Sequence, residues 1–220
     1  MQKVAAFDLD GTILDGESPL KLSTNLTRHR TLPLHKALAM TAWGIKYRLR
    51  LPLTEETPRE LLFSALTEPT VDQVDTQIMH VFNKKIKKHI REDAKRAIAR
   101  CKEKGYFLIL ASASFKPITN AIVYELEMDG QVSTIMEEID GHYTGKVAGK
   151  PVQGEHKIEA ISQYCDMLFG KGKWELSEAY GDHYSDYMML NAAKRPVAVD
   201  PDAKLERIAK RRGWEIQNWQ

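Results

Sequence analysis

The stretch Val4-Ala5-Ala6-Phe7-Asp8-Leu9-Asp10-Gly11-Thr12 decides how the rest of the chain is interpreted. Four apolar residues lead up to Asp8, which is typical of a buried strand whose end carries polar residues. Asp8 and Asp10 are two positions apart, so on extended chain their carboxylates project to the same side. Neighbouring carboxylates repel each other unless a cation or a shared proton lies between them. Mg2+ is the natural cation, because it prefers oxygen ligands and binds one or two carboxylates together with a substrate phosphate.

Other interpretations of this stretch exist. An Asp-x-Asp sequence also fits a loop in which one Asp caps a helix and the glycine turns the chain. A calcium-binding EF-hand loop is excluded, because its sixth position, counted from Asp8, is Ile13 rather than Gly and its twelfth is Pro19 rather than Glu.

Beyond residue 92, short apolar runs alternate with segments of helical periodicity. We expect strands at 4–7, 106–110, 179–180 and 196–199, an edge strand near 214–216, and a hairpin at the Asp-Gly turn within 139–142. We expect helices over 93–104, after Pro117, from Lys157, over 187–193 and over 205–212. Alternating strands and helices predict an α/β fold, a Rossmann-like parallel sheet with helices on both faces. Ligands of such sheets bind at the carboxyl ends of the strands.

Residues 16–92 interrupt this alternation. Their apolar residues recur at helical spacing only, and prolines separate the segments. We therefore predict an all-helical cap domain over 16–92, inserted into a core domain made of 1–15 and 93–220. Residues 17–92 contain 13 Lys and Arg against 8 Asp and Glu, whereas the whole chain has a net charge of only +2. A basic cap over a slightly acidic core suits a metal site that binds an anionic substrate.

Composition excludes several other classes of protein. The chain has 220 residues, of which 43% are hydrophobic and 28% charged, so it can bury a core. It lacks the strong basic excess of a nucleic-acid-binding protein, and its two cysteines are too far apart for a disulfide scaffold or a Cys-rich zinc site. It has no apolar run of membrane-spanning length and no signal-peptide core, so we expect a cytoplasmic protein without stable membrane association. The oligomeric state stays open.

Two further positions suggest binding of an anion. Ser112 follows the second predicted strand and precedes a helix, where its hydroxyl and nearby backbone N–H groups form either an anion-binding site or a simple helix cap. Lys157 lies at the start of a predicted helix, the end that disfavours a cation, so it either serves a bound anion or is an ordinary solvated lysine. Lys150 is a nearby competitor, but it precedes Pro151 in a glycine-rich turn.

The sequence Gly181-Asp182-His183-Tyr184-Ser185-Asp186 places two carboxylates four positions apart. Where a strand turns into a helix, both can face one point. The alternative is one capping Asp and one solvated Asp.

The order of these motifs resembles the haloacid dehalogenase superfamily. Three further segments are similar to its phosphoserine-phosphatase-like members, which carry a helical cap between the first two motifs: Tyr143-Thr144-Gly145, Gly154-Glu155-His156-Lys157, and Val199-Asp200-Pro201-Asp202 with Arg212-Gly213-Trp214. The resemblance spans essentially the whole chain.

The resemblance implies a role for each motif residue. Asp8 would be the nucleophile that forms an aspartyl-phosphate, and Asp10 the acid and base. Mg2+ would bind the Asp8 carboxylate, the Asp10 backbone carbonyl and Asp182, with Asp186 bound through water or orienting the ligands. The phosphoryl oxygens would be bound by Ser112, the Ala113 N–H and Lys157, and Glu17 matches the family residue that meets a substrate ammonium.

The function implied is that of a Mg2+-dependent phosphomonoester hydrolase acting on a small phosphorylated metabolite resembling phosphoserine or histidinol phosphate. A lipid-phosphate phosphatase or a phosphotransferase would use the same chemistry, and a non-catalytic phospho-ligand binding module belongs to another class. The basic segment 34–54, which contains Lys36, Lys46, Arg48, Arg50 and Trp43, is either a solvated cap helix or a surface for lipid headgroups.

His183 and Tyr184 depart from the small residues that the family has after the Gly-Asp of its last motif. We expect both side chains to point away from the metal and to pack at the edge of the sheet. The alternative is that they crowd the metal loop or line the substrate entrance.

Overall fold

The computed structural model describes residues 1–16, 18, 22 and 66–220. The chain divides into two compact units. The first comprises Met1–Gly16, His89–Thr134 and Lys150–Gln220, and the second comprises Glu17–Lys88 and Ile135–Gly149.

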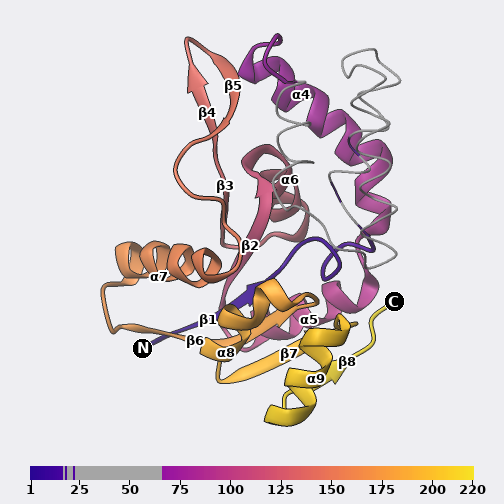
Figure 1. The fold of residues 1–220 in the computed structure, drawn as a ribbon, viewed down its shortest axis with the longest axis vertical. Helices are drawn as coiled ribbons and strands as arrows, with labels where there is room; N and C mark the ends of the chain where they lie inside the picture. Colours follow the sequence, from indigo (N-terminus) through magenta and orange to yellow (C-terminus); the bar gives the residue numbers. More distant parts are fainter. Residues whose placement is uncertain (17, 19–21, 23–65) are drawn as a thin grey trace. The chain divides into compact units, whose positions relative to one another are not determined.

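The first unit is built on a six-stranded sheet in which every paired strand is parallel (Figure 1). In spatial order, the strands are β3 (Gly130–Thr134), β2 (Phe107–Phe115), β1 (Gln2–Phe7), β6 (Trp174–Gly181), β7 (Arg195–Val199) and β8 (Glu215–Gln217). The chain builds β1, β2 and β3 in one direction and then returns to place β6 on the other side of β1. The order therefore reverses between β1 and β6, and this is where ligands of open α/β sheets bind.

Helices connect successive strands of the sheet. They are α5 (Glu92–Glu103), α6 (Lys116–Leu126), α7 (Glu155–Phe169), α8 (Tyr187–Ala192) and α9 (Ala203–Arg212). Buried residues of α7, α8 and α9 pack in one hydrophobic cluster with Val4 and Ala6 of β1. Because parallel connections are right-handed, α5 and α6, which precede the reversal, cover the opposite face. The predicted α/β fold with helices on both faces of a parallel sheet is confirmed.

Two strands are longer than predicted from the sequence, and a third was not predicted. β2 continues beyond residue 110 through the serines to Phe115, β6 begins at Trp174 rather than near 179, and β3 was not expected at all. The reason is composition, since polar and small residues in all three hide the apolar pattern of a buried strand. Pairing with neighbours supplies the missing signal, because β3 pairs with β2 from Ile109 to Phe115.

The second unit contains α4 (Val71–Val81), a short π-helix (Phe82–Ile86) and the hairpin of β4 (Met136–Ile139) and β5 (His142–Val147); a 3-10 turn (Lys87–His89) leads back to the first unit. Thr70 caps α4 in a reciprocal capping box with Gln73. The hairpin turns at Asp140-Gly141, both with positive φ, as an Asp-Gly hairpin requires.

The sequence-based division placed the hairpin in the core domain. Its turn instead pairs with the residues before α4, through a bridge between Thr70 and His142 and a 2.9 Å hydrogen bond from Val71 N to Gly141 O. Most of the predicted cap, including the basic segment 34–54, lies outside the described residues, so its all-helical character stays a prediction.

Among the described residues, no helix combines the length and apolar character that crossing a membrane requires. Cys101 and Cys165 are both buried and free.

Candidate active site

The first candidate residue, Asp8, lies directly after β1. Val4 and Ala6 point into the cluster beneath α7, and because side chains alternate along a strand, Asp8 continues on the same face. Its backbone N–H donates to Tyr180 O at 2.9 Å, which ties it to β6. Asp8 is only 7% exposed, so its carboxyl group is largely removed from water.

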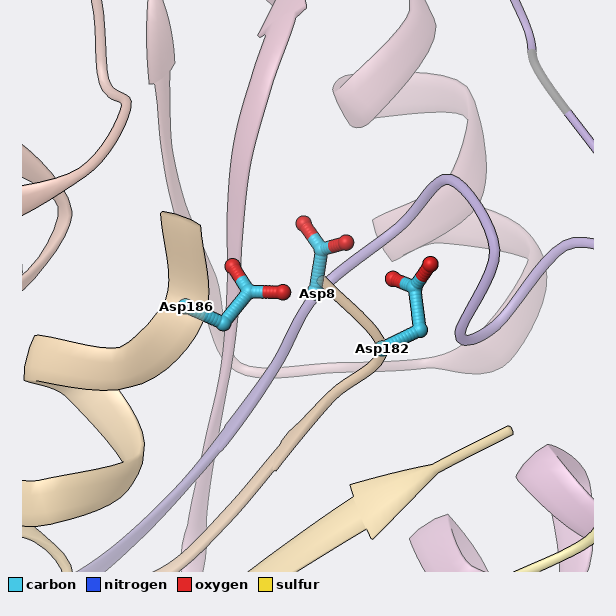
Figure 2. Close-up of side chains that lie close together, drawn as sticks. All are labelled: Asp8, Asp182 and Asp186. Carbon is cyan, nitrogen blue, oxygen red and sulfur yellow. The ribbon is translucent and has the colours of Figure 1, made fainter. Parts of the chain in front are cut away.

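Asp182 and Asp186 come to Asp8 from the neighbouring strand. Asp182 directly follows β6, and Asp186 ends the 3-10 turn Tyr184–Asp186 (η3) that leads into α8. One carboxylate oxygen of each of the three residues lies within 4.8 Å of the others. Figure 2 shows the three carboxyl groups gathered at the end of β1, with Asp8 between the other two. This cluster arises because the carboxyl ends of parallel strands meet at one edge of the sheet.

Lys157, the third residue of α7, joins two members of the cluster. Its ammonium group donates to Asp8 Oδ1 at 2.7 Å and to Asp186 Oδ1 at 2.5 Å. Lys157 is 3% exposed and Asp186 is 1% exposed, so this is a buried ion pair. Lys150, the competitor considered from the sequence, is exposed in the turn before α7.

The electrostatics of the cluster are set by burial and by its own charges. Burial raises the pKa of Asp8 and the Asp186 carboxylate raises it further, whereas Lys157 lowers it; the result is a pKa of about 7. For Lys157, burial lowers the pKa, but the carboxylates of Asp186 and Asp8 outweigh burial and raise it above its usual range. Lys157 is therefore firmly cationic, and it does not fully compensate the carboxylates around it.

A divalent cation fits this donor set. Three carboxylates converge around the site, two of them on buried residues, and the single ammonium group of Lys157 cannot neutralise them all. Burial is the main cause of the raised pKa of Asp8, and the carboxylates of Asp186 and Asp10 add to it, so a further cation beside Asp8 would favour its ionised form. Hard oxygen ligands of this kind are those that Mg2+ prefers.

The loop after β1 is shaped to receive Asp182. Gly11 has a φ of +81°, and a Cβ at this position would lie 2.2 Å from Asp182 Oδ2. Thr12 Oγ1 donates to Asp182 Oδ1 at 3.1 Å and is fully buried. The sequence analysis gave Gly11 only a turn in the alternative interpretation and gave Thr12 no role, although both stand in the stretch quoted first.

The Asp10 carboxylate lies beside the end of β2. Ser114 Oγ donates to Asp10 Oδ2 at 2.8 Å, and Ser114 is only 8% exposed. Ser114 was not predicted to be a site residue. Its place two positions after Ser112, on a strand adjacent to β1, was the available signal.

Ser112 and Ala113 lie within the last part of β2 rather than after it. Ser112 is 1% exposed, and its hydroxyl oxygen accepts from Ser114 N at 3.0 Å. The pairing with β3 becomes irregular between Ser112 and Phe115, so this part of β2 departs from a regular ladder. α6 begins four residues after Ser112, at Lys116. The backbone near Ser112 is thus an irregular strand end, not the helix start that the sequence suggested.

The remaining predicted positions fall elsewhere. Glu17 lies outside the described residues. His183 and Tyr184 contact the segment that begins α9, through Asp202 and Lys204.

The chain is similar in sequence and in fold to several known proteins. The family model for haloacid dehalogenase-like hydrolases matches residues 5–191. Phosphoserine phosphatase SerB1 of Mycobacterium tuberculosis is 23% identical over 98% of this chain and 70% of its own length. The histidinol-phosphatase of Neisseria meningitidis is 34% identical over 51% of this chain and 47% of its own length. A solved structure, a protein with unknown function from Bordetella pertussis, superposes with a TM-score of 0.87 at 25% identity and covers 99% of this chain and 98% of its own.

Proposed function

The chain belongs to the haloacid dehalogenase-like hydrolase family and is a phosphatase, and we propose that it hydrolyses phosphomonoesters of small metabolites through an aspartyl-phosphate on Asp8. The observation that carries this proposal is the convergence of Asp8, Asp182 and Asp186 within 4.8 Å, with Lys157 bound to two of them. The family resemblance of the motifs, predicted from the sequence, is confirmed by the family match.

The first step is attack of the Asp8 carboxylate on phosphorus. The bond from phosphorus to the ester oxygen breaks, and Asp10 gives its proton to the departing alkoxide. Lys157 lies 2.7 Å from Asp8 Oδ1, so its ammonium group is placed to favour the ionised nucleophile and to attract the phosphoryl oxygens. Ser112 and the Ala113 N–H would bind these oxygens from β2.

The second step regenerates the enzyme. Asp10, now ionised, accepts a proton from a water molecule that attacks the phosphorus of the aspartyl-phosphate, and phosphate leaves from Asp8. Asp8, Asp182, Asp186 and the backbone carbonyl of Asp10 would hold Mg2+, which when bound supplies positive charge that stabilises the transferring phosphoryl group.

The names of two relatives support a substrate class for testing. One is named as a phosphoserine phosphatase and another as a histidinol-phosphatase, so small amino-alcohol phosphates are the substrates to test first. Both would present an anionic phosphate to Lys157. A lipid-phosphate substrate or transfer to another acceptor would use the same chemistry at Asp8.

Exchange of the nucleophile tests the proposal. We predict that Asp8→Asn lowers kcat by at least about 1,000-fold, because the amide cannot form an acyl phosphate. The variant should stay folded, since it removes one charge from a buried and crowded cluster. Turnover of para-nitrophenyl phosphate, phosphoserine and histidinol phosphate, with Mg2+ and with EDTA, is the measurement.

The controls distinguish the alternatives. Thermal unfolding of Asp8→Asn establishes that the variant is folded. An Asp8→Asn enzyme with wild-type turnover would show that Asp8 is not the nucleophile. Wild-type protein that binds phosphate but turns over no ester would favour the non-catalytic binding module.

A further inference from the structure

The loop 181–186, which carries Asp182 and Asp186, is held by a second segment of the chain. This supporting segment, residues 200–204, follows β7 and begins α9. Asp202 N donates to the backbone oxygen of Asp182 at 2.8 Å. The contact is made to the same residue whose carboxylate belongs to the acidic cluster.

The two carboxylate oxygens of Asp202 make different contacts. Oδ1 accepts from Leu205 N at 2.7 Å, so Asp202 is the N-cap of α9. Oδ2 lies 3.4 Å from Nε2 of His183, the residue after Asp182. The other ring nitrogen of His183, Nδ1, lies 3.0 Å from Ser185 Oγ and accepts from Ser185 N at 3.2 Å. The imidazole is therefore fixed at both nitrogens, one within the loop and one on the supporting segment.

Tyr184 is held from the same segment. Lys204 Nζ lies 3.2 Å from the centroid of the Tyr184 ring, a cation–π contact. The ring also stacks on Tyr187 of α8, with centroids 6.1 Å apart and planes inclined by 15°. The two bulky residues at 183 and 184 thus each have a partner in the supporting segment.

The supporting segment is itself anchored to the rest of the first unit. The Asp200 carboxylate pairs with the Arg91 guanidinium, which is only 12% exposed, and accepts from Trp219 N at 3.2 Å. Asp200 N donates to Gln217 O of β8 at 2.9 Å. Asp200 has a φ of +38°, a conformation that non-glycine residues hold only where surrounding contacts enforce it.

We propose that Asp202, through His183, and Lys204, through Tyr184, are positioning residues that fix the loop 181–186 for metal binding. The inference rests on the proposed function, because it concerns the ligands of the same metal. The physical reason is that a flexible loop must be ordered before Asp182 can act as a ligand. A loop already held at its backbone and at two side chains does not incur that entropic cost on binding.

Asp202→Asn tests the proposal with little disturbance of the fold. Asparagine keeps the capping oxygen and the backbone N–H, and it is an equally good N-cap. It removes the charge that faces His183. Glu206→Gln is the matched control, because it removes the same charge from the first turn of α9, where Glu206 pairs with Lys210 at 2.6 Å.

The first measurement is thermal unfolding of the substrate-free protein titrated with Mg2+. The Mg2+ concentration for half of the maximal stabilisation should rise about 10-fold in Asp202→Asn, the lower end for groups that orient metal ligands. It should rise about 3-fold in Lys204→Gln, as expected from loss of an exposed cation–π contact. It should stay unchanged in Glu206→Gln. The metal-free melting temperatures should match wild type, and kcat at saturating Mg2+ should change little.

The outcomes separate this inference from the proposed function. If Mg2+ stabilises the wild type and Asp202→Asn responds at the same concentration, the positioning role is refuted while the proposed function stands. Equal shifts in Asp202→Asn and Glu206→Gln would also refute it. A wild-type protein that Mg2+ does not stabilise would refute the metal-dependent function and the positioning role together.

A double variant tests the route of the effect. If Asp202 acts through His183, then Asp202→Asn combined with His183→Gln should bind Mg2+ no more weakly than either single variant. Additive losses would show that the carboxylate of Asp202 does not act through the imidazole.

Discussion

At the scale of single residues, the hydrogen bond from Ser114 to Asp10 links β2 to the proposed acid and base. A serine hydroxyl can donate to an ionised carboxylate or accept from a protonated one, so it can orient Asp10 in both steps. Its distance to Asp10 Oδ2 is 2.8 Å. The contribution of Ser114 to kcat is therefore expected to be largest for substrates whose leaving group needs a proton.

Replacing this hydroxyl should slow the reaction. We predict that Ser114→Ala lowers kcat for phosphoserine about 10-fold, the upper end for losing one hydrogen bond between neutral groups, because Asp10 is protonated when it donates to the leaving group. The loss should be smaller with para-nitrophenyl phosphate, whose leaving group departs without protonation. Steady-state kinetics with both substrates is the measurement.

Ser133→Ala is the matched control. Ser133 is a buried serine on the neighbouring strand β3, and its hydroxyl makes no hydrogen bond among the described residues. Equal losses in both variants, or equal losses with both substrates, would contradict the role given to Ser114.

Single residues also show what the sequence could predict about the site. Asp8, Asp182 and Asp186 were expected near one point because they follow strands whose carboxyl ends meet at one edge of the sheet. Lys157 was expected there from the family resemblance. The contacts of Thr12 with Asp182 and of Ser114 with Asp10 could not be predicted, because each depends on the path of a loop or an irregular strand end.

At the scale of elements, β6 carries a buried glutamate that no apolar pattern explains. Glu178 is 2% exposed and pairs with Lys104 at 2.7 Å, Arg195 at 2.6 Å and Arg100 at 3.2 Å. These cations come from α5, from Lys104 directly after it and from β7, so the carboxylate joins a helix and two strands. Because partners distant in sequence supply the charge, residues 174–178 could not be recognised as strand from their own pattern.

Glu178 should also set a pH dependence of stability. Burial raises its pKa, but hydrogen bonds from Lys104 and Tyr180 and the charge of Arg195 outweigh burial, so the pKa falls from 4.5 to about 2. A depressed carboxyl pKa contributes stability that is present above pH 4.5 and is lost as the pH falls through 2.

We predict that Glu178→Gln lowers the free energy of unfolding at pH 7 by about 3 kcal/mol, and that the difference from wild type shrinks towards pH 2. Urea unfolding at pH 7, 4 and 2.5 is the measurement. Glu175→Gln, which affects a neighbouring and more exposed ion pair with Lys194, is the control and should change stability little. A difference that stays constant with pH would show that Glu178 acts by packing rather than by charge.

At the scale of the whole molecule, Trp219 and Gln220 connect several elements of the first unit. The Trp219 ring packs against Tyr180 at 5.6 Å between centroids and is 8% exposed as a residue. Gln220 N donates to Asp93 at the start of α5 at 2.8 Å. These contacts connect β6, α5 and the segment after β8.

We predict that Trp219→Ala lowers the free energy of unfolding by about 3 kcal/mol, the usual cost of removing a buried aromatic ring. Urea unfolding measures it, and Tyr124→Ala, which removes a ring that is 82% exposed, serves as the control. A loss below about 1 kcal/mol would mean that these last residues do not stabilise the unit.

The overall architecture was predictable where local patterns decide it. Alternating strands and helices indicated the parallel sheet, and the Asp-Gly pair indicated the hairpin. That the hairpin would join α4 was not predictable, because a bridge between Thr70 and His142 decides it over a distance of many residues.

The proposed function depends on phosphorylation of Asp8 during turnover. Acid quenching during steady turnover, reduction with borohydride and peptide mass spectrometry test it most directly, because borohydride reduces an aspartyl-phosphate to homoserine. We expect homoserine at position 8 in wild-type protein supplied with a phosphate ester and Mg2+, and none in Asp8→Asn. Sustained turnover with no modification at position 8, or with the modification at another aspartate, would contradict it.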